Sequence, residues 1–222
     1  MKNEIQTVEK CIIIGAGNCD VTHIDLQDGD ICIAADNGFA YCESRGIKPD
    51  FIIGDFDSVS PKLYEKIQKI EQQKKECVIH LPKEKDDTDM MAAIRLGLQY
   101  GYQKFCLYGA LGGQRFEHSL ANIQCLQFLK NQGAEGTIIE KCQTLSILKR
   151  ESIILEADKI GYVSVFALSE TAEVSIHNMK YELTDTVITN DFPIGISNEL
   201  IGKPAEISVK NGTILLILSE KM

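Results

Sequence analysis

Short apolar runs alternate with longer segments of mixed polarity over the first part of the chain. The short runs predict buried strands, and the longer segments, in which apolar residues recur with helical spacing, predict helices. The expected strands are 11–17, 30–36, 51–55, 77–82 and 104–110, and the expected helices are 37–46, 60–74, 89–101 and 117–133. Strands that alternate with helices in this way predict an α/β fold with a mainly parallel sheet.

Several of the predicted helices carry boundary signals. Ser60 fits the N-cap of the second helix, and Pro61 fits its first position, where proline is tolerated. Gly46 and Gly133 stand where helices commonly end in a left-handed residue.

The pattern changes after about residue 134. Short β-rich runs separated by turn residues replace the alternation, which predicts an all-β sandwich or barrel. The sequence Lys210-Asn211-Gly212 before the last run predicts a hairpin turn. We therefore expect two domains, an α/β domain over 1–133 and an all-β sandwich over 134–222.

Composition narrows the class of protein. The 222 residues are 44% hydrophobic and 25% charged, as in ordinary globular proteins, and the net charge of -9 argues against nucleic-acid binding. No apolar run approaches the ~18 residues of a membrane span, and the N-terminus lacks the apolar core of a signal peptide. The eight cysteines form no CxxC pair and mostly lie in apolar runs, which indicates reduced thiols in a cytoplasmic protein.

Aspartates follow two of the expected strands. Asp36 ends one strand, and Asp55 and Asp57 follow the next. Alternate residues of a strand face the same way, so we expect Asp55 and Asp57 to point together from the carboxyl edge of the sheet, where α/β proteins bind ligands. Paired carboxylates suit Mg²⁺. On its own, however, the motif is explained equally well by a simple aspartate turn or by a helix cap.

A second acidic cluster opens the predicted helix that starts near residue 89. Capping and the helix dipole alone favour carboxylates there, but Asp86, Asp87 and Asp89 are more than capping needs. Asp86 and Asp89 have a spacing that places them on one helix face. Lys83 and Lys85 beside them are candidate phosphate partners.

A glycine-rich turn forms the third element, with Gly109, Gly112 and Gly113 followed by Arg115 and a helix. Backbone N–H groups at a helix start and an arginine fork both bind phosphate, but G-K-[ST] of a Walker A loop is missing. The segment 15–20, GAGNCD, lacks the third glycine of a dinucleotide fingerprint. Acids, glycines and one arginine on a single edge predict Mg²⁺, a nucleoside triphosphate and displacement at phosphorus.

Taken together, these motifs resemble those of the thiamine pyrophosphokinase family over nearly the whole chain. The resemblance rests on ADNG (35–38), PDFIIGDFDSV (49–59), KDDTD (85–89), the glycine segment (109–118), Asn122, MKYELTD (179–185) and GISNEL (195–200). It implies transfer of the β,γ-pyrophosphoryl group of ATP to thiamine, which gives thiamine diphosphate and AMP. It also implies Mg²⁺, an ATP-binding α/β domain, a thiamine-binding β-sandwich, and a homodimer with active sites between subunits.

The resemblance also implies roles for individual residues. The acidic catalytic and metal-binding positions match Asp36, Asp55, Asp57, Asp86 and Asp89; the ATP motif matches Gly109, Gly112, Gly113, Arg115, His118 and Asn122; and the motif near thiamine matches Ser197 and Asn198. We expect Asp55, Asp57 and Asp86 to hold Mg²⁺. Either Asp89 or Asp36 would accept the proton of the thiamine hydroxyl.

The chain departs from the family pattern at a few positions. Asn37 replaces a frequent glycine, Gln114 is an extra residue before Arg115, and Glu117 replaces an aspartate. Tryptophan is absent, so any aromatic stacking on thiamine would come from Tyr, Phe or His.

Other interpretations are kept beside this one. A related pyrophosphokinase could act on a pterin alcohol, and a non-catalytic sensor could bind a nucleotide or thiamine diphosphate. The segment around Ser197 and Asn198 could also be a simple turn.

Overall fold

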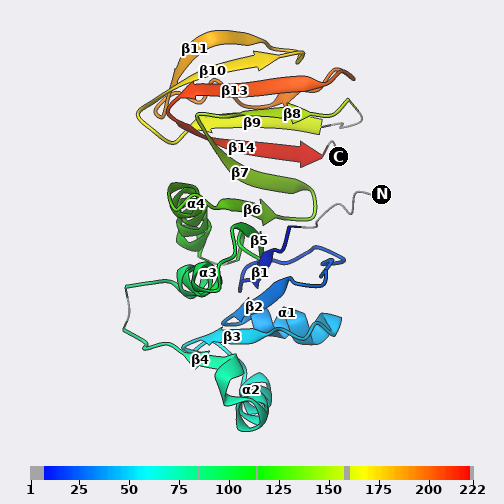
Figure 1. Cartoon of the computed structure of the whole chain (residues 1–222), viewed down its shortest axis with the longest axis vertical. Helices are drawn as coiled ribbons and strands as arrows, with labels where there is room; N and C mark the ends of the chain where they lie inside the picture. Colours follow the sequence, from blue (N-terminus) through cyan, green and yellow to red (C-terminus); the bar gives the residue numbers. More distant parts are fainter. Residues whose placement is uncertain (1–7, 85, 114, 158–160, 221–222) are drawn as a thin grey trace, which may run out of the picture. The chain divides into compact units, whose positions relative to one another are not determined.

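The computed structural model describes residues 8–84, 86–113, 115–157 and 161–220 (Figure 1). The chain divides into two compact units, Met1–Lys141 and Cys142–Met222. Among the described helices, none combines the length and the apolar composition needed to cross a membrane.

The first unit is built on a parallel sheet. Its neighbouring strands follow the order β6-β5-β1-β2-β3-β4, and each adjacent pair runs parallel. The strands are β1 (Cys11–Ile14), β2 (Ile31–Ala35), β3 (Phe51–Gly54), β4 (Val78–His80), β5 (Lys104–Tyr108) and β6 (Glu135–Ile139). Every residue of β1 and β2 is buried, as expected for a sheet covered on both faces.

Helices cover the two faces of this sheet (Figure 1). They are α1 (Gly38–Arg45), α2 (Pro61–Gln73), α3 (Asp89–Gln99) and α4 (Phe116–Asn131), with a short 3₁₀ turn at Lys75–Cys77. Phe39 of α1 and Ile67 of α2 belong to one buried cluster with Ile12. On the other face, Gly97 of α3 lies so close to Cys11 and Phe105 that a Cβ there would meet their side chains.

The predicted helix boundary signals are confirmed, whereas the helices expected to reach residues 101 and 133 end at Gln99 and Asn131. The Ser60 hydroxyl accepts a hydrogen bond from the Leu63 N–H at 3.4 Å, and α2 begins at Pro61. Gly46 follows α1 with φ 68°, and Gly133 follows α4 with φ 78°, both in the left-handed region that glycine enters without strain.

The connection from β1 to its parallel neighbour β2 contains no helix, although all of residues 15–30 are described. Part of this segment packs against the sheet in the place that a connecting helix usually takes. Ile24 is buried in the same cluster as Phe39, and the Val21 carbonyl accepts a hydrogen bond from the Tyr41 hydroxyl at 2.6 Å. The segment therefore covers the sheet beside α1.

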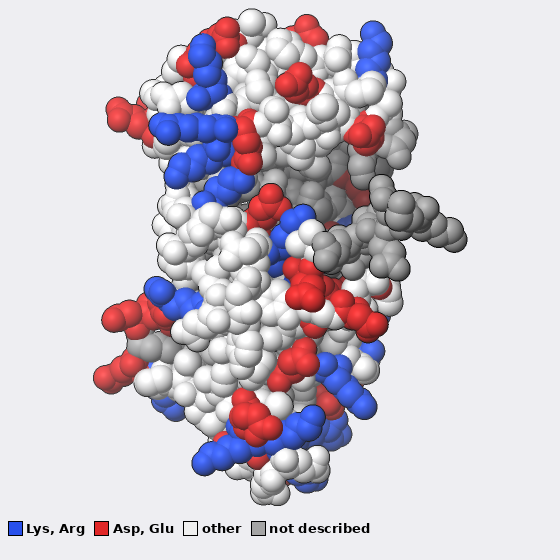
Figure 2. Space-filling model, in the orientation of Figure 1, with Lys and Arg blue, Asp and Glu red and all other residues white. Residues whose placement is uncertain are grey.

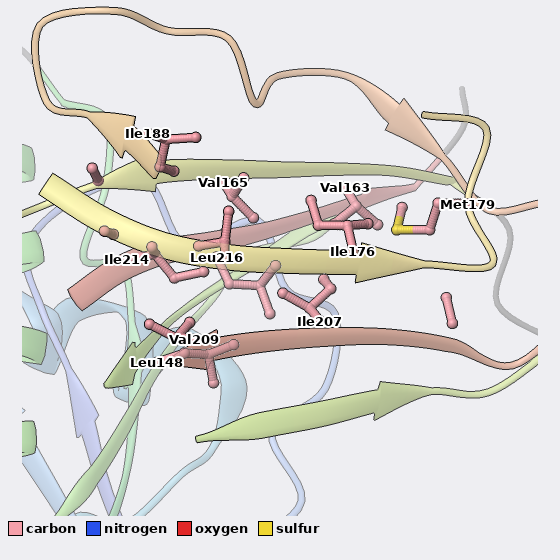
Figure 3. Packing of buried hydrophobic residues seen from close by; sticks show 14 of the residues in the cluster. Leu148, Val163, Val165, Ile176, Met179, Ile188, Ile207, Val209, Ile214 and Leu216 are labelled. Carbon is pink, nitrogen blue, oxygen red and sulfur yellow. The ribbon is translucent and has the colours of Figure 1, made fainter. Parts of the chain in front are cut away.

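The second unit consists of two antiparallel sheets. Their strand orders are β12-β9-β14-β7 and β11-β10-β13-β8. The strands are β7 (Gln143–Lys149), β8 (Ser152–Leu155), β9 (Gly161–Ala167), β10 (Thr171–His177), β11 (Leu183–Thr189), β12 (Asn198–Glu199), β13 (Ala205–Asn211) and β14 (Thr213–Glu220). Side chains of both sheets, among them Val165, Ile176, Ile207 and Leu216, meet in one apolar core (Figure 3). The expected α/β fold followed by an antiparallel β domain is confirmed.

The position of β6 differs from the sequence interpretation, which began the second domain at residue 134. β6 pairs in parallel with β5, and the first unit continues to Lys141. A short apolar run that no helix follows has the same sequence pattern in a parallel sheet as in an antiparallel one. The sequence therefore did not show which sheet β6 joins.

The predicted hairpin at Lys210–Gly212 is wrong. β13 pairs with β10 and β8, whereas β14 pairs with β7 and β9, so the turn carries the chain from one sheet to the other. Gly212 has φ 82°, and a Cβ there would lie 2.4 Å from the Thr171 carbonyl oxygen. Turn residues alone could not distinguish this crossing from a hairpin.

Candidate active site

Asp36 lies at the carboxyl end of β2 with an unusual combination of features. Its backbone has φ 49°, and its N–H donates to the Ile53 carbonyl at 2.8 Å. Its side chain is only 8% exposed, and its Oδ2 accepts a hydrogen bond from the Ser58 hydroxyl at 2.6 Å. The other oxygen, Oδ1, is buried without a hydrogen-bond partner in the described structure. Such an oxygen is an unsatisfied hydrogen-bond acceptor.

Asp55 and Asp57 adopt a turn, which corrects the expectation that strand alternation aligns them. β3 ends at Gly54, and Phe56 between the two aspartates has φ 59°, which no strand residue has. The Asp57 N–H donates to Asp55 Oδ1 at 3.2 Å, as in an aspartate turn. Phe56 is buried, and its ring packs edge-on against His80 with centroids 5.2 Å apart. Because the Phe56 ring is buried, Asp57 is left exposed at the sheet edge.

The second acidic cluster is arranged differently from the expectation as well. Thr88 is the N-cap of α3, and its hydroxyl accepts from the Met91 N–H at 3.2 Å. Asp89 is therefore the first helical residue, and exposed Asp86 precedes the helix instead of sharing a helix face with it. Asp87 forms an ion pair with Arg95 at 2.8 Å. Since Thr88 supplies the side-chain cap, capping does not account for Asp86 and Asp89.

The pKa of Asp36 depends on residues from several elements of the first unit. Burial raises the pKa of Asp36, the Ser58 hydroxyl and the Asn37 N–H lower it, and the charges of Asp89 and Asp55 raise it further. The carboxylates at the end of β3 and at the start of α3 therefore lie near enough to act on Asp36 at the end of β2. Among the described residues, no group of three or more His, Cys, Asp or Glu side chains is arranged to hold a metal.

Asn37 and Gly38 follow Asp36 and start α1. Gly38 lies so near β1 that a Cβ would be 2.0 Å from the Ile14 carbonyl oxygen, which requires glycine there. Asn37 has φ -67° and is exposed, so a side chain fits where the family often has glycine.

The glycine-rich turn after β5 is held by side chains of its own unit. Gly109, Gly112 and Gly113 all have positive φ, between 57° and 82°. The Ala110 carbonyl accepts from the buried Asn122 amide at 2.6 Å. Two N–H groups of the turn also donate inward, from Leu111 to Glu140 Oε1 at 3.3 Å and from Gly112 to the Ser119 hydroxyl at 3.1 Å. Hydrogen bonds to Asn122, Glu140 and Ser119 therefore hold the turn in place.

The segment after β1 that looked like a dinucleotide fingerprint also supports this turn. The Gly15, Gly17 and Asn18 N–H groups donate to the carbonyls of Tyr108, Gly109 and Leu111, at 2.8, 2.8 and 3.0 Å. These amides are thus occupied by protein acceptors and do not form a phosphate cradle.

Arg115 and His118, which the family resemblance assigns to ATP binding, lie at the exposed start of α4. Arg115 is the N-cap residue of α4 and makes no side-chain capping hydrogen bond. Its Nε pairs with Glu117 Oε1 at 2.8 Å, and this hydrogen bond lowers the pKa of Glu117. His118 is exposed. Gln114 and Lys85, which the sequence also singled out, lie outside the described residues.

Ser197 and Asn198 lie in the second unit, and they differ in their surroundings. Ser197 is exposed with φ 56°, and its N–H donates to the Ser164 hydroxyl at 3.0 Å. Asn198 is 6% exposed, and its amide exchanges two hydrogen bonds with the backbone of Tyr181, at 2.6 and 3.0 Å. Asn198 thus connects the segments 179–185 and 195–200, which both carried the resemblance.

Sequence reasoning missed three residues of this site. Ser58 completes the GDFDS motif but received no role, and its contact with Asp36 required the turn at Phe56. Ser119 was hidden among ordinary helix residues. Glu140 follows β6 just as Asp36 follows β2, so assigning β6 to the first sheet would have identified it.

Comparison with known proteins gives consistent matches over both units. The model described as "Thiamin pyrophosphokinase, catalytic domain" matches residues 25–138, and "Thiamin pyrophosphokinase, vitamin B1 binding domain" matches residues 150–214. The thiamine pyrophosphokinase of Bacillus subtilis (strain 168) is 29% identical over 190 residues, which are 84% of this chain and 86% of that protein.

Solved structures agree with these matches. The crystal structure of the Bacillus subtilis thiamine pyrophosphokinase superposes with a TM-score of 0.83 at 26% identity, over 96% of this chain and 100% of the other. That of the Geobacillus thermodenitrificans enzyme gives 0.79 at 28% identity, over 96% and 98%. Because the catalytic-domain model alone spans half of its length, the chain belongs to the thiamin pyrophosphokinase family of enzymes.

Proposed function

We propose that this enzyme transfers the β,γ-pyrophosphoryl group of ATP to the hydroxyethyl oxygen of thiamine with the help of Mg²⁺, giving AMP and thiamine diphosphate. The observation that carries the proposal is the buried Asp36 carboxylate, which has an unpartnered oxygen and lies within electrostatic range of Asp55 and Asp89. Carboxylates at one sheet edge, beside a well-held glycine-rich turn, suit displacement at phosphorus.

Asp55, Asp57 and Asp86 would each contribute a ligand to the metal, although no three acidic side chains of the described structure are already arranged as a metal site. Their oxygens are the ligands that Mg²⁺ prefers, and this ion takes few carboxylates and fills its other positions with water and phosphate oxygens. Bound there, it would neutralise phosphate charge in an acidic protein. The exposure of Asp57 and Asp86 leaves these oxygens accessible to a metal–nucleotide complex.

Asp36 is our choice for the residue that accepts the proton of the thiamine hydroxyl. A primary alcohol is a weak nucleophile at neutral pH, and a base whose pKa is raised toward neutrality removes its proton more effectively. Burial and two neighbouring carboxylates raise the pKa of Asp36. The Ser58 hydroxyl donates to Oδ2, and Oδ1 has no hydrogen-bond partner in the described structure, so the carboxylate keeps an unsatisfied acceptor.

The glycine-rich turn, Arg115, His118 and Asn122 form the proposed ATP side of the site. Arg115 is exposed and can move from Glu117 to a phosphate, whereas Asn122 acts by holding the Ala110 carbonyl.

Ser197 and Asn198 belong to the proposed thiamine side. The match of residues 150–214 to a vitamin B1 binding domain favours thiamine over a pterin alcohol as the acceptor. Tyr181, which is 61% exposed and adjoins Asn198, is a candidate for stacking on thiamine in the absence of tryptophan.

The family resemblance extends the proposal to a cytoplasmic homodimer. The cysteines are all free thiols, as in proteins of a reducing compartment. Light scattering on the purified protein should give twice the mass of one chain.

Turnover of thiamine by metal-site variants tests the proposal. Asp55→Asn should abolish thiamine diphosphate formation, because a neutral amide holds Mg²⁺ poorly. The thermal unfolding temperature should change little, since Asp55 is at a partly exposed turn. Retention of most of kcat would contradict the assignment of Asp55.

A further inference from the structure

Glu140 is a carboxylate at the phosphate side of the first unit for which the proposed reaction has no role yet. It directly follows β6 and is partly buried. Its Oε1 accepts the Leu111 N–H at 3.3 Å. Glu140 therefore holds the glycine-rich turn at Leu111.

The other groups that hold this turn do not change charge with pH. They are the hydroxyl of Ser119, the amide of Asn122 and the backbone of the segment 15–18. Among these described partners, Glu140 is the one that titrates. A carboxylate would repel a phosphate that it touched, so Glu140 serves the turn and not the ligand directly.

We propose that Glu140 is a positioning residue for the nucleotide: its ionised carboxylate fixes the Leu111 amide and thereby keeps the glycine-rich turn in its phosphate-accepting shape, so that protonation of Glu140 weakens nucleotide binding. The inference rests on the proposed ATP site. A charge-assisted hydrogen bond from a backbone N–H is stronger than a neutral one, so the turn is held less firmly once the charge is lost.

The surroundings of Glu140 raise its pKa above that of an exposed glutamate. Burial raises its pKa, the N–H groups of Leu111 and Ala110 lower it, and the charge of Asp20 raises it. Cys19 also faces Glu140, but burial raises the pKa of this thiol, so it stays neutral. Both facing side chains come from the segment between β1 and β2.

The test measures binding of a non-hydrolysable ATP analogue with Mg²⁺, without thiamine, by calorimetry from about pH 8 to about pH 5. Glu140→Gln keeps an oxygen that can accept the N–H but cannot titrate. We expect its affinity to lie within about threefold of the wild type at the upper pH. Toward the lower pH, the wild type should lose affinity relative to Glu140→Gln.

Two further variants complete the design. Glu140→Ala leaves the Leu111 N–H without this acceptor and should bind about tenfold more weakly than the wild type at the upper pH, with a smaller difference at the lower pH. Glu135→Gln makes the same chemical change at the exposed first residue of β6, where the Glu135 carboxylate lies 3.8 Å from the Lys104 ammonium, and should keep the wild-type pH profile. Thermal unfolding of each variant shows whether it is folded.

The outcomes separate this inference from the proposed function. If Glu140→Gln shows the same acid-side loss as the wild type, or if folded Glu140→Ala binds as tightly as the wild type, Glu140 does not position the turn. If the wild type itself binds no Mg²⁺–nucleotide at any pH, the ATP site is wrong, and the inference is wrong with it.

Discussion

At the scale of single residues, Asp36 combines several locally unfavourable features. Its backbone has φ 49° although it is not glycine, its side chain is buried, and one oxygen has no hydrogen-bond partner among the described residues. Such features commonly cost about 1–3 kcal/mol each and cluster at functional sites. We therefore expect substitution of Asp36 to affect activity and stability in opposite directions.

Asp36→Asn should therefore lower kcat about 100-fold or more, because the amide cannot accept the hydroxyl proton. The unfolding temperature should stay equal or rise, since the amide oxygen can still accept from Ser58 while the buried charge is removed. Steady-state kinetics and thermal unfolding measure the two effects.

Asp50→Asn is the matched control. Asp50 Oδ2 accepts the Cys32 N–H at 2.9 Å on the same sheet, in a structural contact. This variant should lose a little stability and keep its kcat. An Asp36→Asn enzyme with wild-type kcat would refute the role of Asp36 as the base.

Asn198 gives a second prediction at this scale. Asn198→Ala removes the two hydrogen bonds to Tyr181 and one from the Glu199 N–H at 2.9 Å. The free energy of unfolding in urea should fall by about 2–4 kcal/mol. Unchanged stability with a raised KM for thiamine would instead mean that Asn198 acts on the substrate alone; exposed Asn190→Ala is the control.

At the scale of elements, the site depends on two loops that lie side by side at the ends of β1 and β5. Gly17 and Asn18 donate to carbonyls of the glycine-rich turn, and Ser119, Asn122 and Glu140 hold the same turn from the other elements. A turn held at so many points loses little conformational freedom when it binds a phosphate. Its shape should be sensitive to any atom inserted between the loops.

Gly17→Ala inserts such an atom. Its Cβ would lie 2.5 Å from the Leu111 carbonyl oxygen and 2.6 Å from that of Gly109, so the turn must shift. We expect kcat/KM for ATP to fall about 10- to 100-fold, because small misplacements strongly reduce the rate. Titration of ATP at saturating thiamine measures this effect.

The control for this prediction is Gly46→Ala at the end of α1. No atom lies within 4 Å of a Cβ there, but φ 68° disfavours alanine. It should lower stability by about 1 kcal/mol and leave kcat/KM for ATP unchanged. If both variants lose ATP efficiency equally, the effect comes from stability and not from the turn.

The elements themselves were largely predictable from the sequence. Apolar runs identified β1 to β5, and residues such as Ser60, Pro61 and Gly46 fixed helix ends through local chemistry. Local chemistry could not tell which sheet a short strand joins. For this reason the partners of β6 and the crossing at Gly212 required the tertiary structure.

The site was predictable as a set of residue types but not as an arrangement. The charges of Asp55 and Asp89 do reach Asp36, which the order of the motifs along the chain suggested. Strand alternation failed for Asp55 and Asp57 because Phe56 turns inward with a left-handed backbone and packs on His80. A buried aromatic residue overrode the local pattern.

At the scale of the whole molecule, charge shapes what the enzyme can bind. The net charge is -9, and acidic and basic side chains are interspersed on the face shown in Figure 2. Such a protein attracts the cationic thiazolium of thiamine and repels ATP unless a metal neutralises the phosphates. Nucleotide binding should therefore depend on the metal.

Removal of divalent metal with a chelator should abolish turnover and nucleotide binding, and added Mg²⁺ should restore both. The unfolding temperature without ATP should barely change, because each unit has its own apolar core. Mg²⁺ with ATP should raise it through binding to the folded state. Unfolding on chelation alone would mean that the metal is structural.

The most direct measurement is the identity of the products. The purified enzyme is incubated with ATP, Mg²⁺ and thiamine, and the nucleotides and thiamine esters are separated by chromatography. Attack at the β-phosphorus predicts AMP and thiamine diphosphate in equal amounts, both dependent on thiamine. ADP with thiamine monophosphate, or no thiamine-dependent loss of ATP, would contradict the account.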